Sequence, residues 1–324
     1  MDVLIIGAAG MIGQRLANRL VTDPGTLGGE INALLLADAV PPTRPENAPF
    51  LVETMACDFS EPGRAEELIA QRPKVIFHLA AIVSGEAEAD FDKGYRINLD
   101  GTRYLFDAIR NAGDGYCPRV VFTSSIAAFG APFPDTIPDD FHLTPLTSYG
   151  TQKAICELLL SDLTRRGIMD GIGIRLPTIV VRPGKPNKAA SSFFSGIIRE
   201  PLNGQEALLP VGDDVLHWMA SPRAAVGFLL HAATLDTEMI GMHRNLTMPG
   251  VAATVADEID SLKRIGGAEK VKLIRRVPDE TIQQIVAGWP RQFDARRSQQ
   301  LGFKADPSFD AIVRTYIEEE GIVF

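Results

Sequence analysis

The sequence predicts an α/β protein whose first part folds as a doubly wound parallel sheet. Over roughly the first 180 residues, short apolar runs alternate with helical patterns. The runs are unbroken rather than interleaved with polar residues, which is typical of strands covered by helices on both faces. A glycine-rich turn also joins the first apolar run to the first helical pattern. Together these observations favour the doubly wound architecture of the Rossmann fold.

Each element of this sheet follows from its own stretch of sequence. Apolar runs of strand length predict strands, and longer stretches with apolar residues at helical spacing predict the helices between them. The strands are expected at 3–6, 33–36, 55–57, 75–79, 120–123 and 172–176, and the helices at 11–21, 64–71, 97–111 and 149–165.

The character of the chain changes after Pro177. Prolines, glycines and short helical patterns at 192–199, 252–265 and 310–319 dominate this part. We expect residues 1–176 to form the Rossmann domain and residues 177–216 and 249–324 to form a smaller mixed C-terminal lobe. Residues of about 217–248 are expected to pack back on the first domain, because the stretch 224–234 is strongly apolar.

Composition and charge exclude several classes of protein. The net charge of −9 argues against a nucleic-acid surface, which needs a basic stripe. No stretch reaches the ~20 apolar residues of a membrane span, and no leader pattern precedes the first strand. The three scattered cysteines and five histidines fit neither a disulfide framework nor a metal site. We therefore expect a cytoplasmic protein without metal, membrane or nucleic-acid partners.

The turn after the first strand has the context of a dinucleotide-binding loop. Gly7, Gly10 and Gly13 are spaced Gly-x-x-Gly-x-x-Gly, and Met11 and Ile12 open the first helix. Glycines let the backbone approach a pyrophosphate, and the helix N-terminus offers free N–H groups to it. We expect this turn to bind the phosphates of a dinucleotide, the alternative being a purely structural turn.

Acidic residues follow the second and third strands. A carboxylate at Asp38 can accept hydrogen bonds from the adenosine ribose and repels a 2′-phosphate, which favours NAD over NADP. The loop 23–29 accounts for its long spacing from the glycines, and a solvated turn residue is the alternative. Asp58, next to Phe59, is expected to accept from the adenine amino group or to cap the following helix. His78, at the end of the fourth strand, is expected to be a packing residue.

Tyr149 and Lys153 are the most informative pair in the chain. They are four residues apart at the start of a helical pattern, so they share one helix face. A free tyrosine has a pKa near ~10, and a fixed cation beside it favours the phenolate. Such a pair can take the proton from a carbinol. The simpler alternative is an exposed tyrosine stacked on a lysine stem.

Taken in order, these motifs resemble those of the extended short-chain dehydrogenases/reductases. Within this family the whole chain most resembles the bacterial D-erythronate dehydrogenases, which oxidise a four-carbon sugar acid at C2 with NAD. Nucleotide-sugar 4-epimerases and 4,6-dehydratases are cousins in the same family. The matching residues are Gly7, Gly10, Gly13, Asp38, Asp58, Leu79, Ala80, Ala81, Asn98, Ser124, Ser125, Tyr149, Lys153, Arg175, Leu176, Pro177 and Thr178.

The resemblance implies a role for each matching position. Tyr149 corresponds to the general base, Lys153 to the lysine that holds the nicotinamide ribose, and Ser125 to the serine that hydrogen-bonds the reacting oxygen. Ser124 is expected to face away from the substrate, because side chains alternate along a strand. Asn98 corresponds to a residue that supports this polar relay. The segment Pro177, Thr178 and Ile179 corresponds to the one flanking the nicotinamide carboxamide, and the small residues Leu79, Ala80 and Ala81 leave room for NAD.

Two departures from the family pattern narrow the substrate. Ser125 is followed by Ile126, Ala127 and Ala128 instead of the Asp-Glu pair of the dehydratases. Where nucleotide-sugar enzymes carry an arginine for the substrate diphosphate, the corresponding residue here is Leu216, which cannot pair with phosphate. Both departures favour a small sugar acid, and a nucleotide-sugar 4-epimerase stays as the alternative function. A dinucleotide sensor is disfavoured, because the base and its lysine are both present.

Several polar residues are candidates for binding the substrate. A sugar acid needs a cation or amide for its carboxylate and hydrogen-bonding groups for its hydroxyls. The acidic run 86–90 is expected to be a solvated helix face, or alternatively a lid, and a homodimer through 97–111 and 149–165 is expected by analogy. The candidates are Arg182, Lys185 and Lys188 for the carboxylate, Ser84, Ser125 and Ser192 for hydroxyls, and His217 and Trp218 as pocket walls.

Overall fold

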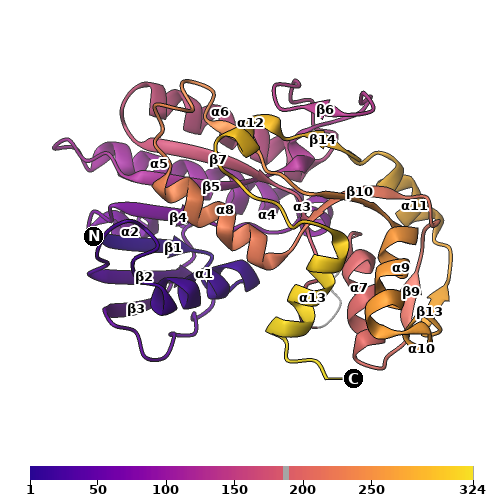
Figure 1. The fold of residues 1–324 in the computed structure, drawn as a ribbon. Helices are drawn as coiled ribbons and strands as arrows, with labels where there is room; N and C mark the ends of the chain where they lie inside the picture. The colour runs from indigo at the N-terminus through magenta and orange to yellow at the C-terminus, as the bar shows by residue number, and fades with distance from the viewer. Residues whose placement is uncertain (185–189, 324) are drawn as a thin grey trace. The chain divides into compact units, whose positions relative to one another are not determined.

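The computed structural model describes residues 1–184 and 190–323. The chain divides into two compact units, each with its own core. Figure 1 labels the helices and strands of both. The first unit comprises Met1–Ala128, Thr147–Arg175 and Val226–Leu246, and the second comprises Phe129–Leu146, Leu176–Ala225 and Thr247–Phe324.

The first unit is built on a seven-stranded sheet with the order β11-β7-β5-β4-β1-β2-β3. Strand β1 pairs in parallel with both β2 and β4, and the pairs β2–β3 and β4–β5 are also parallel. This order places β1 between β4 and β2, and the strand order reverses direction there, which confirms the predicted doubly wound sheet. The strands are β1 (Asp2–Ile6), β2 (Ala33–Asp38), β3 (Leu51–Ala56), β4 (Val75–His78), β5 (Arg119–Ser125), β7 (Asp170–Leu176) and β11 (Asn245–Thr247).

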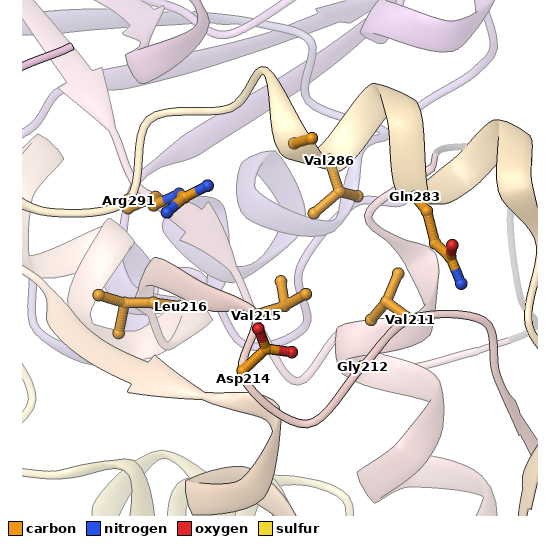
Figure 2. A pocket seen from close by; sticks show the side chains of 9 residues that line it. Val211, Gly212, Asp214, Val215, Leu216, Gln283, Val286 and Arg291 are labelled. Carbon is orange, nitrogen blue, oxygen red and sulfur yellow. The ribbon is translucent and has the colours of Figure 1, made fainter.

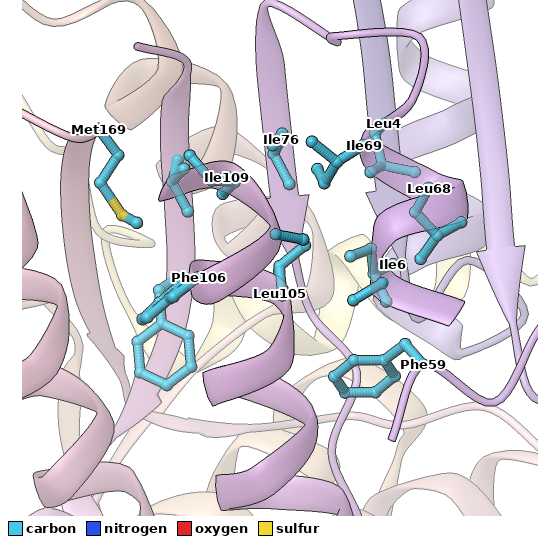
Figure 3. Close-up of a cluster of buried hydrophobic side chains, with 14 of the residues drawn as sticks. Leu4, Ile6, Phe59, Leu68, Ile69, Ile76, Leu105, Phe106, Ile109 and Met169 are labelled. Carbon is cyan, nitrogen blue, oxygen red and sulfur yellow. The ribbon is translucent and has the colours of Figure 1, made fainter. Parts of the chain in front are cut away.

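Helices cover this sheet through a continuous apolar cluster (Figure 3). Leu4 and Ile6 of β1 point to the same face, as the two-residue period of a strand requires, and they belong to one cluster with Leu68 of α2 and Leu105 of α5. The helices and turns of the unit are α1 (Met11–Thr22), α2 (Arg64–Ile69), α3 (Ser84–Ala89), α4 (Phe91–Gly94), a π-helical segment (Tyr95–Gly101), α5 (Thr102–Asn111), a 3₁₀ turn (Ile126–Ala128) and α6 (Ser148–Arg165). Helix α8 (Pro222–Thr234) begins in the second unit and ends in the first.

Some elements differ from the sequence expectation. The third strand was expected only at 55–57, but β3 begins at Leu51, because an edge strand leaves residues such as Glu53 exposed and breaks the apolar run. The helix expected at 97–111 begins at Phe91 and passes through the π-helical segment without interruption. The seventh strand, β11, is three residues long and was not expected from the sequence.

The second unit contains three small sheets flanked by helices, as expected for a mixed lobe. Strand β10 pairs in parallel with β8 and antiparallel with β12, while β9 pairs with β13 and β6 with β14. Its elements are β6 (Ile137–Pro138), β8 (Thr178–Ile179), α7 (Ser192–Leu202), β9 (Ala207–Leu209), β10 (Leu216–Ala220), β12 (Val251–Thr254), α9 (Val255–Gly266), α10 (Ala268–Val271), β13 (Ile274–Arg276), α11 (Glu280–Ala287), β14 (Phe293–Asp294), α12 (Arg296–Gln300) and α13 (Phe309–Glu319). The expected helix 252–265 is thus a strand, β12, followed by α9.

The compact units also differ from the expected domain limits. Residues 129–146 were expected in the first domain, but they belong to the second unit, where β6 pairs with β14. Residues 217–225 belong to the second unit as well, because β10 pairs with β8 and β12 there. Strand pairing between distant segments decides these limits, and the composition of the chain does not reveal it.

Candidate functional site

The turn after β1 is shaped so that only glycine fits at two positions. Gly7 has a φ of +92°, and a Cβ on it would lie 2.6 Å from the backbone nitrogen of Ala80. A Cβ on Gly13 would lie 2.7 Å from the Cα of Ala8. The Gly10 N-cap of α1 provides no side-chain hydrogen bond, so first-turn N–H groups are left for an anion. This cradle, with Met11 and Ile12 in the first turn, fits the pyrophosphate of a dinucleotide.

Asp38 lies beside this turn at the end of β2. Its Oδ2 accepts a hydrogen bond from the N–H of Ala9 at 2.9 Å. The carboxylate is therefore tied to the glycine turn while remaining partly exposed. Its position fits the predicted role as an acceptor for ribose hydroxyls.

Asp58 is held as an anion between two elements. Its Oδ1 accepts from the backbone and hydroxyl of Ser60, and its Oδ2 accepts from Arg96 at 2.9 Å. Burial raises the pKa of Asp58, but the hydrogen bonds from Ser60 and Arg96 outweigh it, so the pKa lies below its ordinary value. The alternative role as a helix cap is wrong, because the N-cap of α2 is Gly63 and no side chain bonds there. The adjacent Phe59 is buried, and a Cβ on Gly101 would lie 2.7 Å from its ring.

Asn98 holds the loop after β4 in place through hydrogen bonds to the backbone of Ile82. The Asn98 side chain accepts from the N–H of Ile82 at 2.9 Å and donates to the Ile82 carbonyl at 3.2 Å. It also donates to Gln152 of α6 at 2.8 Å. Since Asn98 is only 2% exposed, it acts as a strut that sets the path of the loop containing Leu79, Ala80 and Ala81.

The residues on either side of this loop, His78 and the start of α3, lie in the surroundings that the sequence predicted. His78 packs against Phe59 and Phe122, and its Nε2 hydrogen-bonds the hydroxyl of Thr102 at 2.8 Å. Burial, with a contribution from the Lys153 charge, lowers the pKa of His78 to about 3, so this histidine is neutral. Ser84 begins α3 and is partly exposed, and the acidic run forms the exposed face of that helix.

Tyr149 and Lys153 lie on the first turns of α6, as their spacing predicted. Thr147 caps this helix by accepting from the N–H of Gly150. The ammonium of Lys153 lies 5.7 Å from the centre of the Tyr149 ring and 4.7 Å from that of Phe122. It donates to the carbonyl of Thr123 at 2.8 Å, and no other described residue supplies an acceptor to it. Its remaining N–H groups fit the hydroxyls of a nicotinamide ribose.

Burial lowers the pKa of Lys153. Lys153 is 3% exposed, and burial lowers its pKa to about 8, with Cys156 and Glu157 opposing the effect. A cation with so little solvation is a strong local source of positive potential. The alternative of an exposed tyrosine on a solvated lysine stem is therefore wrong for the lysine.

Ser125 and Ser124 point into different surroundings at the end of β5. The Ser125 oxygen accepts from the N–H of Ala127 at 3.1 Å, and none of the described residues accepts a hydrogen bond from its hydroxyl. The Ser124 hydroxyl instead donates to the buried carboxylate of Glu157 at 2.5 Å. Any contribution of Ser124 to NAD binding must therefore come through its backbone.

Glu157 belongs to a buried ion pair that the sequence analysis missed. Arg175 of β7 donates to its carboxylate from Nε at 3.0 Å and from Nη2 at 2.8 Å, and the side chains are 8% and 1% exposed. The pair lies one helical turn after Lys153, and it connects α6 to β5 and β7. The sequence did contain a signal for this role of Glu157, because it follows Lys153 by four residues and so lies on the same helix face.

The candidates in the second unit are more heavily engaged in packing. The Thr178 hydroxyl, between Pro177 and Ile179, pairs with Nε2 of His217 at 2.6 Å. His217 stacks on Phe194, and burial lowers its pKa to about 3. Trp218 is 8% exposed, and its N–H donates to the Met248 carbonyl, so its contacts are those of a core residue rather than a pocket wall.

The remaining candidates for binding the substrate are two partly exposed residues and two that the structure does not describe. Arg182 is partly exposed, and its Nε donates to the Ile179 carbonyl at 2.8 Å. Ser192 is partly exposed as the first residue of α7. Lys185 and Lys188 lie outside the described residues.

A pocket in the second unit was not anticipated (Figure 2). It has a volume of about 220 Å³, and Leu216 contributes to its lining. Its polar groups are Asp214, Gln283 and Arg291, none of which belongs to a recognisable motif. Within the described residues, no cluster of three or more metal-ligating side chains occurs.

A Rossmann sheet with a glycine turn, a strand-end aspartate and a buried lysine one turn from a tyrosine is typical of nicotinamide-dependent oxidoreductases. The model of the NAD dependent epimerase/dehydratase family matches residues 3–237. The chain belongs to this family, and it is an NAD-dependent oxidoreductase.

Two similar proteins are D-erythronate dehydrogenases. The one from Cupriavidus necator is 45% identical over 327 residues and covers 99% of each chain. The one from Haemophilus influenzae is 41% identical over 318 residues, covering 98% of this chain and 99% of its own. A crystal structure described as the nucleoside-diphosphate-sugar epimerase from Agrobacterium tumefaciens has 61% identity and a TM-score of 0.97, covering 100% of this chain and 95% of that one.

Proposed function

We propose that the protein oxidises a small sugar acid, D-erythronate, at C2 to 2-dehydro-D-erythronate with NAD. The similarity to two D-erythronate dehydrogenases over the whole length of the chain carries this proposal. The arrangement of Tyr149, Lys153 and Ser125 at the start of α6 and the end of β5 supports it, since it supplies a base, a cation and a hydrogen-bond donor.

The residues would divide the work as follows. NAD held in this site would supply the acceptor for the hydride that leaves C2. Tyr149 takes the hydroxyl proton as the C2 oxygen becomes a carbonyl, and Lys153 stabilises the phenolate electrostatically. Ser125 would donate a hydrogen bond from its hydroxyl to the reacting oxygen, which stabilises alkoxide character as the proton leaves.

The cofactor would be held by the first unit. The glycine turn and the first turn of α1 receive the pyrophosphate, Asp38 the adenosine ribose and Asp58 the adenine amino group. We propose NAD rather than NADP, because the Asp38 side chain lies beside the turn, where a carboxylate would repel a 2′-phosphate.

The direct test mixes purified protein with NAD and D-erythronate and follows NADH at 340 nm. Steady NADH production that requires both substrate and protein is expected. A flat trace across a panel of four-carbon acids would remove the proposed reaction.

A nucleotide-sugar epimerase is the second candidate, favoured by the description of the Agrobacterium structure. One feature weighs against it. Leu216 stands where an arginine would pair with the diphosphate, and it lines the pocket of about 220 Å³. An epimerase retains its NAD and gives no net NADH, so the same assay, run beside a test for UDP-sugar interconversion, separates the two reactions.

We also propose a homodimer through the stretches 97–111 and 149–165 that the resemblance implies, together with α4, which leads directly into the first of them. Phe91 of α4 and Ile155 and Leu158 of α6 are exposed to 57%, 38% and 68%, and α4 lies against α6. Large exposed apolar side chains on neighbouring helices favour an interface. Sedimentation equilibrium giving the monomer mass would contradict this.

A cytoplasmic location remains our proposal. None of the described helices has the length and apolar character needed to cross a membrane. The three cysteines are free thiols, which fits a reducing compartment.

A further inference from the structure

The end of β5 is bonded to α6 at two consecutive residues. The ammonium of Lys153 donates a hydrogen bond to the carbonyl of Thr123 at 2.8 Å. The hydroxyl of the next residue, Ser124, donates to the carboxylate of Glu157 at 2.5 Å. Lys153 and Glu157 are four residues apart, so both contacts run from one face of α6 to the two residues directly before Ser125.

The carboxylate that Ser124 contacts is held from its other side by β7, the neighbour of β5 in the sheet. The Nε of Arg175 donates to the two carboxylate oxygens of Glu157 at 3.0 and 3.1 Å, and its Nη2 donates to one of them at 2.8 Å. The backbone carbonyl of Glu157 also accepts from Asn245 of β11 at 3.2 Å. A guanidinium that bonds both oxygens restricts the rotation of a carboxylate. The acceptor for the Ser124 hydroxyl therefore has a set position.

Stability alone does not account for this buried pair. The side chains of Arg175 and Glu157 are 8% and 1% exposed, so both charges have lost their hydration. Replacing such a pair by apolar residues of similar volume is often neutral or stabilising. Apolar residues could fill the same space, but they could not accept a hydrogen bond from Ser124. A buried polar network whose members are satisfied makes its surroundings rigid, and here those surroundings include the end of β5.

Ser125 lies directly beyond these contacts. Side chains alternate along a strand, so Ser125 is turned away from the carboxylate to which Ser124 bonds. Tyr149 lies one turn before Lys153 on α6, and its ring centre is 5.7 Å from the Lys153 ammonium. Holding the end of β5 against α6 therefore holds Ser125 in one place relative to Tyr149.

We propose that Glu157 is a positioning residue for the reaction. Through the hydroxyl of Ser124 it sets the place of Ser125 against Tyr149, so that both groups reach the same oxygen of the substrate. Arg175 keeps the carboxylate in the orientation that this contact needs. The inference rests on the proposed function, which gives Ser125 and Tyr149 their parts in the reaction.

The first test removes the hydroxyl and leaves the ion pair in place. A catalytic group displaced by 1 Å can cost about 100-fold in rate, so a shift of about half that size in Ser124→Ala should lower kcat about tenfold. KM for D-erythronate and for NAD should change less than about threefold, because the binding groups remain. Ser124→Thr keeps the hydroxyl and should restore kcat to within about threefold of wild type.

The matched control is Ser161→Ala. Ser161 lies on the same helix, and its hydroxyl donates to the backbone carbonyl of Glu157 at 2.9 Å and accepts from Asn245 at 3.0 Å, so these contacts run to α6 and β11 rather than to β5. Its kcat should match that of wild type within about twofold. All rates are measured well below the lowest unfolding midpoint, so that a loss of folded protein does not enter kcat.

A second variant separates positioning from stability. Glu157→Met/Arg175→Met should keep most of the native unfolding midpoint, because apolar replacement of a whole pair is close to neutral. It also takes away the acceptor of Ser124, so kcat should stay about tenfold low although the midpoint recovers. A double variant with both a native midpoint and a native kcat would show that the pair is structural only. If the double variant does not fold, Ser124→Ala carries the test.

The outcomes separate this proposal from the reaction. Active wild type with an unchanged kcat in Ser124→Ala overturns the positioning role and leaves the reaction intact. If wild type oxidises another hydroxy acid but not D-erythronate, the proposed substrate is wrong, and the same variants are compared on that acid. If no acid is oxidised, crystal structures of wild type and Ser124→Ala with NAD decide. The distance from Ser125 Oγ to Tyr149 Oη should then differ by at least about 0.5 Å, the tolerance of a catalytic arrangement, and an equal distance overturns the positioning role.

Discussion

Replacement of Arg175 by methionine tests the energetic weight of the buried ion pair behind Lys153. In the native protein Arg175 makes hydrogen bonds to both oxygens of Glu157, and both side chains are at most 8% exposed. Methionine fills much of the same volume but leaves the buried Glu157 carboxylate with the Ser124 hydroxyl, at 2.5 Å, as its remaining side-chain partner among the described residues. The native pair offers three close donor–acceptor contacts from Arg175, at 2.8, 3.0 and 3.1 Å.

The expected loss is large because the remaining charge is uncompensated. Breaking a buried pair from one side typically costs about 3–5 kcal/mol. At about 2–4 °C per kcal/mol for a unit of this size, the unfolding midpoint should fall by roughly 6–20 °C. The double variant Glu157→Met/Arg175→Met removes both charges and should recover most of this loss, since apolar replacement of a whole pair is close to neutral.

The matched control lies on the same helix. Arg165 of α6 pairs with Asp162, but the side chains are 58% and 51% exposed. Arg165→Met should cost less than about 0.5 kcal/mol, as exposed pairs do. Urea and thermal unfolding followed by circular dichroism measure all four proteins. An Arg175→Met midpoint equal to that of Arg165→Met, or a double variant worse than the single one, would refute the reasoning.

Three further predictions concern the candidate site. Tyr149→Phe should lower kcat by at least ~100-fold, the contribution of a positioned acid–base group, and leave NAD affinity within a few-fold; retained turnover in a stopped-flow assay would mean that another group is the base. Folding lowers the pKa of Lys153 from 10.5 to about 8. Between these pH values the unfolded chain binds more protons than the folded one, so the free energy of unfolding should increase with pH, by up to ~1.4 kcal/mol per pH unit. Urea midpoints of the apoprotein between pH 7 and 10 should therefore rise for wild type relative to Lys153→Met, and a constant difference would contradict the buried charge. Asp38→Ala should raise kcat/KM for NADP relative to NAD. An unchanged ratio would mean that Asp38 is a solvated turn residue without a role in cofactor choice.

Much of the first unit could be predicted because its signals are local. The segments that form β1, β2, β4, β5 and β7 are largely unbroken apolar runs. Strands covered by helices on both faces have this pattern, because neither face meets solvent. The glycine turn was equally readable, since Gly7 has a positive φ and lies against Ala80, which only glycine allows. The expected limits of the edge strand β3 were too short, because most of its residues are exposed and the polar Glu53 and Thr54 interrupt its apolar run.

The site was only partly predictable for a related reason. Spacing placed Tyr149 and Lys153 on one helix face, and the structure has them there. Spacing did not reveal that Asn98 fixes the loop at Ile82, or that Trp218 packs in a core. Those facts depend on partners far away in the chain, and the catalytic and binding roles themselves stay predictions until they are measured.

The sequence by itself determined the doubly wound sheet, the dinucleotide turn and the tyrosine–lysine pair, because each depends on residues close together in the chain. Only the tertiary structure decided the Glu157–Arg175 ion pair and the pocket around Arg291. The physical reason is that burial, ion pairs and pockets arise where distant segments meet. Asp214, Gln283 and Arg291 come from separate stretches of the chain, and they line one pocket only because those stretches meet in the fold.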